Sequence, residues 1–241
     1  MHFTVIVIGD NPEKQLAPYD EQLTDEVGNY NPYGFWDWFQ LGGRWTGFFK
    51  LKEGATGKIN NPEFNAKKVE EGYADQALKK DIDFETMTKD CIERNKRLYD
   101  NINKILNKHP KIITWNELKE KYKCNDCFEE KYNKCISKVK DEYWTQPAIK
   151  EILTSDYVSP VIDVFELEQF LKPKEEYLSL VKYEDIVPYA FIENGRWIAK
   201  GEMGWFFSND KMSQTEWNKV FFDSLNKLPD DTLLSLYDCH I

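Results

Sequence analysis

The sequence predicts an α+β protein whose two chain ends form one antiparallel or mixed sheet, and three observations lead to this prediction. Phe3–Ile8 is a run of β-branched and aromatic residues that stops at Gly9-Asp10-Asn11-Pro12, which is typical of a strand followed by a turn. Residues 186–241 alternate short apolar runs with turn signals. Residues 88–185 instead carry Lys, Glu and Asn around apolar positions at helical spacing. Strands at both ends and helices between them predict this fold class.

The N-terminal part is expected to supply a central strand, because Phe3–Ile8 is continuously hydrophobic. Residues 12–34 are rich in Pro, Asn, Asp and Tyr and are expected to form an irregular, ordered loop. The first half of the aromatic segment 35–51 is expected to be a short helix, and Thr46–Leu51 a strand. Between them, Gly42-Gly43 marks a place where the backbone turns sharply or approaches another group closely.

The C-terminal part carries the strongest local signals. Asn194-Gly195 is the favoured two-residue turn for a hairpin between Pro188–Ile192 and Trp197–Lys200. Thr232–Ile241 is expected to be the last strand. Since the first and last strands are the most hydrophobic, we expect them to be adjacent in the middle of the sheet, in a ferredoxin-like arrangement.

A helix is predicted between the hairpin and the last strand. Ser213 is followed three residues later by Glu216, which is the capping-box pattern at a helix start, and the helix is expected to extend to Leu228.

The middle of the chain is predicted to be mainly helical. Apolar residues recur at helical spacing over Asp83–Lys108 and Trp115–Trp144, and Val164–Leu171 is a further short helix. Pro110 separates the first two segments, and Pro147 is expected to end the second. The predicted domains are residues 1–87 with 186–241 as one α+β domain, and residues 88–185 as a mainly helical insertion.

Charge and composition limit the possible partners and locations. The net charge is −10, with −4 in residues 1–50, +3 in 51–150 and −9 in 151–241. An acidic chain repels nucleic-acid phosphate, so direct nucleic-acid binding is not expected, whereas docking on a basic surface is compatible with it. No apolar run approaches the length of about 20 residues that a membrane span needs. The absence of a signal-peptide pattern and the odd number of cysteines, five, predict a cytoplasmic protein.

The most unusual segment contains Trp36, Asp37, Arg44 and Trp45 around Gly42-Gly43. Arg44 could clamp a phosphate or carboxylate while the rings stack on a base. The structural alternative is that the tryptophans fill the core, the glycines form a turn, and Asp37 pairs with Arg44.

Two further segments repeat this chemistry. Glu202 and Trp205 lie beside glycines, where Glu202 could be a general base or a ligand-orienting acceptor, or else a surface residue of a tight turn. Asp238 and His240 share one face of the last strand, and Cys239 between them points to the other face. They could form an oriented acid–imidazole pair, or simply a buried and hydrogen-bonded chain end.

Metal and cofactor signals are weak. The acidic string of Asp75, Asp81, Asp83 and Glu85 could hold a hard cation, but it lacks the spacing of a Ca²⁺ loop. The thiols of Cys124, Cys127 and Cys135 begin a zinc pattern that lacks a fourth ligand, so buried free thiols are expected instead. The sequence contains no Walker loop, GxGxxG, HExxH or GxSxG motif, and no cofactor or metal is predicted.

Several motifs resemble a family of uncharacterised proteins common in phage and prophage genomes. The resemblance covers roughly residues 1–87 and 186–241, and its motifs are His2-Phe3-Thr4-Val5, Gln15–Glu21, Trp36-Asp37-Trp38, Gly42–Gly47, Ala74–Ala77, Asp81-Ile82-Asp83, Gly201–Trp205 and Asp238-Cys239-His240. The family carries no established activity, so the resemblance indicates provenance rather than mechanism.

Phage accessory proteins of this size are often counter-defence factors, and the resemblance implies such a role. The first hypothesis is an inhibitor that binds a host defence protein, or that captures its nucleotide signal between Trp36, Arg44, Trp45, Glu202 and Trp205. The alternative is an enzyme that acts on a nucleotide or a modified side chain. In that hypothesis Arg44 is the anion clamp, and Glu202, Asp238 or His240 is the acid or base.

Overall fold

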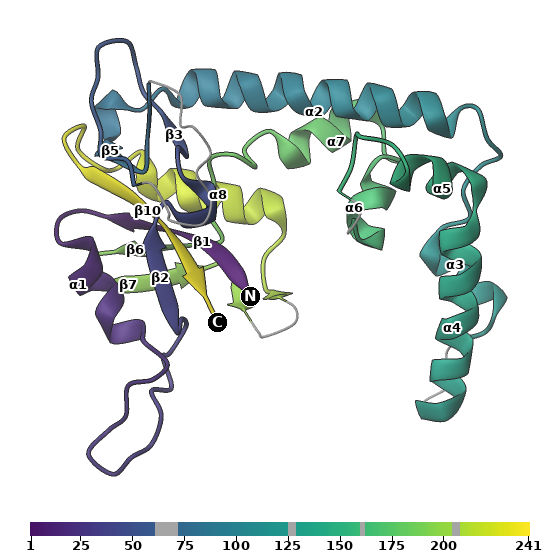
Figure 1. Cartoon of the computed structure of the whole chain (residues 1–241), viewed down its shortest axis with the longest axis horizontal. Coiled ribbons are helices and arrows are strands. Elements are labelled where there is room, and N and C mark those ends of the chain that lie inside the picture. The colour runs from purple at the N-terminus through teal and green to yellow at the C-terminus, as the bar shows by residue number, and fades with distance from the viewer. Residues whose placement is uncertain (61–71, 125–128, 160–161, 204–207) are drawn as a thin grey trace. The chain divides into compact units, whose positions relative to one another are not determined.

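The computed structural model describes residues 1–60, 72–124, 129–159, 162–203 and 208–241, and it divides the chain into two compact units. Unit 1 consists of Met1–Cys91 and Lys182–Ile241, and unit 2 of Ile92–Val181. Both chain ends belong to unit 1, where the Met1 amino group donates a hydrogen bond to the carbonyl of Ile241 (Figure 1).

Unit 1 is built on a six-stranded sheet, and the predicted α+β class is confirmed. β1 pairs antiparallel with β10 and parallel with β6, so the sheet is mixed. β1 and β10 are adjacent in the middle of the sheet, as predicted (Figure 1). The strand order is β2 (Trp38–Leu41), β10 (Leu233–His240), β1 (His2–Ile8), β6 (Ala190–Glu193) and β7 (Arg196–Ala199), and β5 (Gln76–Leu78) also pairs with β10.

The strand topology differs from the predicted ferredoxin-like arrangement. The main elements do follow the order of such a fold, since β1 is followed, after the inserted helices, by the β6–β7 hairpin, α8 (Gln214–Leu225) and β10. In a ferredoxin-like sheet, the second strand of the hairpin lies beside the first strand of the chain and is antiparallel to it. Here the first strand of the hairpin, β6, occupies that place and is parallel to β1.

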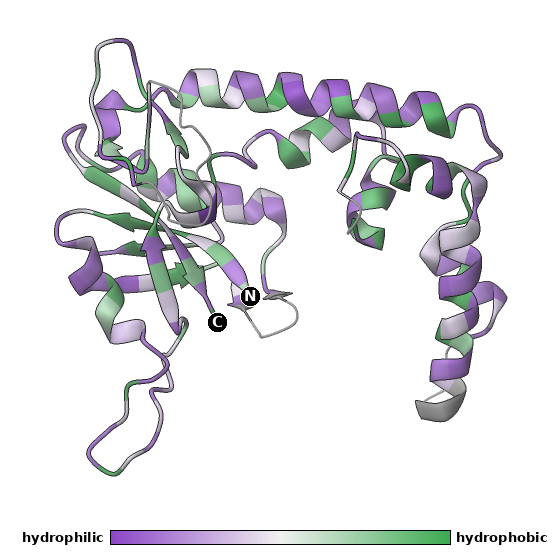
Figure 2. Cartoon of the chain, in the orientation of Figure 1, coloured by the Kyte–Doolittle hydropathy of each residue, from purple (hydrophilic) through white to green (hydrophobic). Residues whose placement is uncertain are grey.

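The central strands divide their side chains between two cores, one on each face of the sheet. Ile6 and Leu236 pack with Phe221 of α8 in one core. Val5 and Tyr237 pack with Leu16 in the other, where α1 (Pro12–Leu16) lies. Both faces of β1 are therefore covered, which explains its continuously hydrophobic sequence. Figure 2 shows hydrophobic residues concentrated on these central strands.

The predicted hairpin and C-terminal helix are confirmed. Asn194 and Gly195 have φ values of 54° and 71°, as the two-residue turn between β6 and β7 requires. Ser213 is the N-cap of α8, and its side chain and that of Glu216 form the predicted capping box.

Residues 12–51 depart from the predictions. The expected short helix in the first half of segment 35–51 is wrong, because Trp38–Leu41 pairs with β10 as strand β2. Pairing with a strand about 200 residues away therefore outweighs the helical preference that was expected for this short segment. The predicted strand Thr46–Leu51 is reduced to β3 (Phe49–Lys50), which pairs with β4 (Tyr73–Ala74), and the predicted irregular loop contains α1 and the 3₁₀ turn η1 (Ala17–Tyr19).

The remaining short elements of unit 1 are two 3₁₀ turns and a pair of strands. They are η2 (Gly43–Trp45), η3 (Lys79–Asp81), β8 (Gly201–Met203) and β9 (Ser208–Asp210), and the two strands pair with each other.

Unit 2 is helical, and α2 enters it from unit 1. Pro147 begins α5 rather than simply ending the preceding helix, since proline is well suited to the first turn. The buried core includes Ile102, Leu118, Val139 and Ile149. The helices are α2 (Phe84–Leu106), α3 (Trp115–Lys121), α4 (Glu129–Thr145), α5 (Pro147–Leu153), α6 (Val164–Gln169) and α7 (Lys174–Val181).

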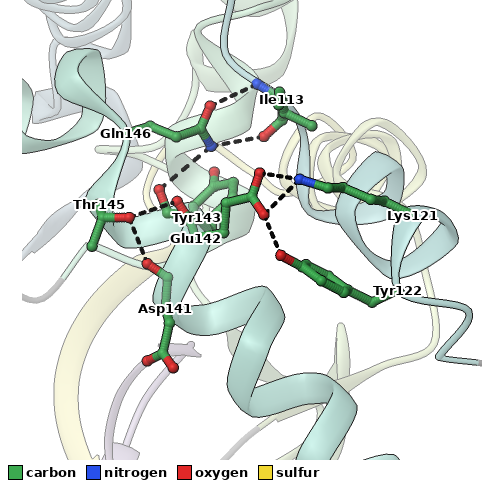
Figure 3. A network of polar contacts seen from close by, with 8 residues as sticks. All are labelled: Ile113, Lys121, Tyr122, Asp141, Glu142, Tyr143, Thr145 and Gln146. Carbon is green, nitrogen blue, oxygen red and sulfur yellow. Dashed lines mark hydrogen bonds and ion pairs between the residues drawn. The ribbon is translucent and has the colours of Figure 1, made fainter.

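Polar contacts fix α4 against the preceding segment (Figure 3). The Glu142 carboxylate accepts hydrogen bonds from Lys121 at 2.6 Å and from the Tyr122 hydroxyl at 2.5 Å. The Gln146 amide bonds both backbone groups of Ile113, accepting from its N–H at 2.8 Å and donating to its carbonyl at 2.9 Å. These contacts set the position of α3 relative to α4.

Candidate functional site

Three strands of unit 1 bring aromatic and imidazole side chains together at one end of the sheet. His2 is the first residue of β1, His240 the last of β10, and Trp38 the first of β2. In the strand register, His2 is opposite His240, and His240 is opposite Trp38. Directly opposite residues on neighbouring strands point to the same face of a sheet, so these three side chains form a row.

Both histidines of this row are bonded to aspartates. The Nδ1 atom of His2 lies 2.8 Å from Oδ1 of Asp238, and the Nδ1 atom of His240 lies 2.8 Å from Oδ1 of Asp37. An ionised carboxylate only accepts hydrogen bonds, so Nδ1 carries the proton in each neutral ring, and Nε2 is left to exchange a proton with a ligand. We call His2–Asp238 and His240–Asp37 the paired dyads.

The paired dyads are in mutual contact and differ in burial. The imidazole centroids are 4.8 Å apart, with the ring planes at 63°. The Asp238 side chain is 1% exposed, whereas those of His2 and His240 are 21% and 37% exposed. One carboxylate is thus anchored inside the protein while both rings reach solvent, which is the arrangement that proton exchange with a bound molecule requires.

The backbone of η2 donates a further hydrogen bond to the Asp238 carboxylate. Its second oxygen, Oδ2, accepts a hydrogen bond of 3.0 Å from the backbone N–H of Arg44. Gly43 precedes Arg44 with φ at +49°, and a Cβ built on it would lie 2.3 Å from the Cβ of Asp238. Glycine is therefore required for the backbone to approach this carboxylate.

Asp75 holds the other side of the same turn. Its buried carboxylate accepts hydrogen bonds from the Gly47 N–H at 2.5 Å, the Thr46 hydroxyl at 2.8 Å and the Asn60 N–H at 2.8 Å. A Cβ on Gly42 would lie 2.4 Å from the Asp75 carboxylate, and φ is +70° there. The two glycines thus lie between two buried aspartates, and the turn that follows strand β2 is fixed on both sides.

The structure separates the residues of the predicted Trp36–Trp45 site. Trp36 is buried, and its indole donates to the Leu16 carbonyl at 3.1 Å, while Trp45 packs against the core on the α8 side. The alternative pairing of Asp37 with Arg44 is wrong, because the Asp37 carboxylate bonds His240 instead. The Arg44 side chain is exposed, and its guanidinium has no hydrogen bond or ion pair within the described part of the chain.

Within the described residues, no hydrogen bond or ion pair joins Glu202 to the dyads. Glu202 is exposed on β8, where its carboxylate accepts from Lys211 at 2.5 Å. Trp205 lies outside the described residues. Of the predicted acid and base groups, Asp238 and His240 are therefore the two that belong to the same cluster. They do not bond each other; each takes a partner from another strand or from the segment before β2.

The predicted site residues did not include His2 or Trp38, although Trp38 belongs to the aromatic segment whose rings were expected to stack on a base. The Trp38 ring is 44% exposed and lies 5.8 Å from that of His2 in an edge-to-face arrangement. The positions of the two histidines in the chain could have indicated that His2 belongs to the site. If the first and last strands are expected to pair antiparallel, a histidine one residue from each chain end predicts that the two histidines meet at one end of the sheet.

The acidic string does not converge on a cation site. Within the residues that the structure describes, no group of three or more His, Cys, Asp or Glu side chains is arranged to hold a metal. Asp75 is buried in the turn described above. Asp83 accepts from the Thr86 N–H at 3.0 Å at the start of α2, and hydrogen bonds from Thr86 hold its pKa below the ordinary value.

The expectation of free thiols in the middle of the chain is wrong for Cys124 and Cys135. They form a disulfide between the end of α3 and helix α4, with Cα atoms 5.6 Å apart. The left-handed backbone of Lys123, with φ at 54°, turns the chain so that Cys124 faces α4. Cys127 lies outside the described residues. The disulfide also removes one argument for a reducing compartment, so the cytoplasmic location stays a prediction.

Comparison with known proteins adds no relative: no family model matches the chain, and no curated protein and no solved structure is detectably similar to it. Among the helices of the described ranges, none has the length and apolar character that crossing a membrane would need.

Proposed function

We propose that this protein is an enzyme that cleaves a phosphodiester or related phosphate ester of a nucleotide, with His2 and His240 as its acid–base pair. The observation that carries this proposal is the contact between the paired dyads. Catalysis by proton transfer needs imidazoles whose tautomer and orientation are fixed, as the Asp238 and Asp37 carboxylates fix them here. A site that merely binds a ligand has no such requirement.

Two imidazoles account for both proton transfers of the reaction. The Nε2 atom of the neutral ring takes a proton from an attacking water or ribose hydroxyl, and the oxygen's electron pair forms the new bond to phosphorus. The bond from phosphorus to the leaving oxygen breaks, and the other, protonated ring donates its proton to that oxygen. Asp37 and Asp238 act as positioning residues, because they touch the histidines and not the reacting atoms.

Two neighbours support a nucleotide as the substrate. Trp38 offers a half-exposed indole next to His2, which suits stacking with a base. Arg44 has an exposed guanidinium on the turn that bonds Asp238, which suits a charged hydrogen bond to phosphate. With the resemblance to phage proteins, these features favour a host nucleotide signal as the substrate and counter-defence as the biological role.

Capture of the same nucleotide without cleavage is the competing proposal, and one experiment separates the two. A bacterial nucleotide extract is incubated with the protein, and bound and free compounds are identified by mass spectrometry. The variants are His2→Gln and His240→Gln. His109→Gln is the matched control, since His109 bonds Glu151 at 2.6 Å in unit 2 and forms a similar imidazole–carboxylate pair away from the site.

Cleavage predicts that one compound disappears in excess over the protein and that a product appears. Loss of either histidine of the paired dyads should slow this by about 10²- to 10⁴-fold, and loss of His109 should not. Recovery of an unchanged ligand at one per chain would favour capture. Equal behaviour of all three variants would overturn the assignment of the site.

A further inference from the structure

The loop between η1 and β2 exposes an unusual amount of apolar surface. We call residues 20–34 the projecting loop, which extends away from the sheet beyond α1 (Figure 1). Val27 is 86% exposed, Tyr30 77%, Tyr33 67% and Leu23 46%. Single exposed hydrophobic residues are common, but four within eleven consecutive positions are characteristic of binding surfaces.

The tip of the projecting loop is ordered by Asp25. One carboxylate oxygen accepts from the Val27 N–H at 2.9 Å and from the Asn29 N–H at 2.8 Å, and the other accepts from the Asn29 side chain at 2.8 Å. The Asn29 bonds hold the pKa of Asp25 below its ordinary value, so the carboxylate is charged at neutral pH. Thr24 and Tyr30 form a bridge across the loop just below this tip.

The base of the projecting loop is fixed by Asn31. Its side-chain amide donates to the carbonyls of Pro18 at 2.8 Å and Asp20 at 3.0 Å, and its oxygen accepts from the Tyr33 N–H at 3.0 Å. The exposed rings are therefore presented by a backbone that is already in one conformation. Such preorganisation lowers the entropy lost on binding, and tyrosine on ordered loops is a recurrent contact residue of binding proteins.

The charge of the projecting loop indicates the kind of partner. Asp20, Glu21, Asp25 and Glu26 lie within it, and it contains no Lys or Arg. A second copy of this chain is an unfavourable partner, because the whole chain has a net charge of −10. A surface with basic residues around apolar pockets is complementary both to the acidic residues of the loop and to its exposed apolar side chains.

We propose that the projecting loop is a docking surface for a partner protein that presents Lys and Arg residues around an apolar pocket. The tyrosines and Val27 supply the buried contact, and the acidic residues supply selectivity and a fast encounter. The loop is also attached to the candidate site, because the Gln22 side chain bonds the Asp37 carbonyl at 3.4 Å. The base of the projecting loop therefore lies next to Asp37 of the paired dyads. This proposal does not depend on the nucleotide chemistry proposed above.

Selection from a random peptide display library tests the docking surface without a known partner. The intact protein is the only target of the selection, and a Tyr30→Ser, Tyr33→Ser variant is compared with it afterwards, when the affinity of each selected peptide is measured. Phe165→Ser is the matched control, since Phe165 is 82% exposed in unit 2. Circular dichroism shows whether each variant keeps the fold.

The expected peptides combine Lys or Arg with aromatic or aliphatic residues. Their affinity should fall by about tenfold or more in the double tyrosine variant, stay unchanged in Phe165→Ser, and weaken with added salt and in Glu26→Gln. Peptides without basic residues, or peptides that bind the double variant equally well, would overturn the proposal. Loop-dependent dimerisation in analytical ultracentrifugation would overturn it as well, by making a second copy the occupant.

Discussion

At the scale of single residues, the candidate site depends on a backbone position that only glycine can occupy. Gly43→Ala should destabilise the protein more than Gly28→Ala, and thermal and denaturant unfolding measure the difference. Both positions have positive φ, so both alanines carry a backbone strain of about 1–2 kcal/mol. The alanine at 43 additionally meets Asp238 at 2.3 Å, whereas nothing lies within 4 Å at 28. The extra cost of overpacking is about 1–3 kcal/mol, and equal effects would contradict the described turn.

Arg44→Ala separates a binding role from a structural one. Because the side chain is exposed and Asp37 is already bonded to His240, the melting temperature should not change. Affinity for a phosphate-bearing ligand should fall by about 1.5–3 kcal/mol, as for one charged hydrogen bond. Arg196→Ala, which removes an exposed arginine from β7, is the control. A large drop in melting temperature with Arg44→Ala alone would show that the residue is structural.

Which tryptophan faces a ligand could not be predicted from the segment alone. Trp36 and Trp38 are two residues apart, yet one is buried and the other is half-exposed. Trp36 precedes β2, and its indole bonds Leu16 of α1, whereas Trp38 is in β2 opposite His240. The difference depends on contacts with residues distant in the sequence. Asp238 and His240, in contrast, could be predicted to share a face, because strand alternation is local.

At the scale of elements, predictions succeeded where the signal was local. The capping box of α8 is an example, and Ser213→Ala should lower stability by about 1 kcal/mol, since the Glu216 N–H loses its acceptor. Thr114→Ala removes the same kind of cap from α3 in unit 2 and is the matched comparison. Amide exchange in β10, which packs under α8, should accelerate with Ser213→Ala and not with Thr114→Ala. If both substitutions accelerated amide exchange in β10 equally, the assignment of the Ser213 cap to the helix that packs on β10 would be contradicted.

At the scale of the whole molecule, buried acidic hydroxyl and thiol groups predict a loss of stability in alkali. Burial raises the pKa of Tyr189 to about 12, and it also raises those of Tyr237 and Cys239. Groups that bind their protons more tightly in the folded state contribute stability that is complete below the pKa of the unfolded chain. For thiol and phenol those values are about 8.5 and 10, so stability should fall from about pH 8.5 toward pH 12.

Denaturant unfolding at a series of pH values checks this prediction. Tyr189→Phe should reduce the loss of stability between about pH 10 and 12, because it removes one ionising group from the unfolded chain. Unfolding free energy that stays constant up to about pH 11 would contradict the burial of these groups.

The arrangement of the strands was the least predictable feature of the whole molecule. Local patterns identified β1, the β6–β7 hairpin, α8 and β10, and the pairing of β1 with β10 followed from their hydrophobicity. Whether β6 or β7 lies beside β1 depends on the pairing of the hairpin with a strand about 185 residues away in the sequence. The composition change near residue 88 falls inside α2, which begins in unit 1 and ends in unit 2.

The central claim is that His2 and His240 act as one acid–base unit. The most direct measurement is the rate of cleavage of bis(p-nitrophenyl) phosphate by His2→Gln, His240→Gln and the double variant, with His109→Gln as the control. Each single change should lower the rate by about 10²- to 10⁴-fold. The double variant should be little slower than the worse single variant, because residues that act together are not additive. Full activity in either single variant, or losses that multiply, would contradict the claim.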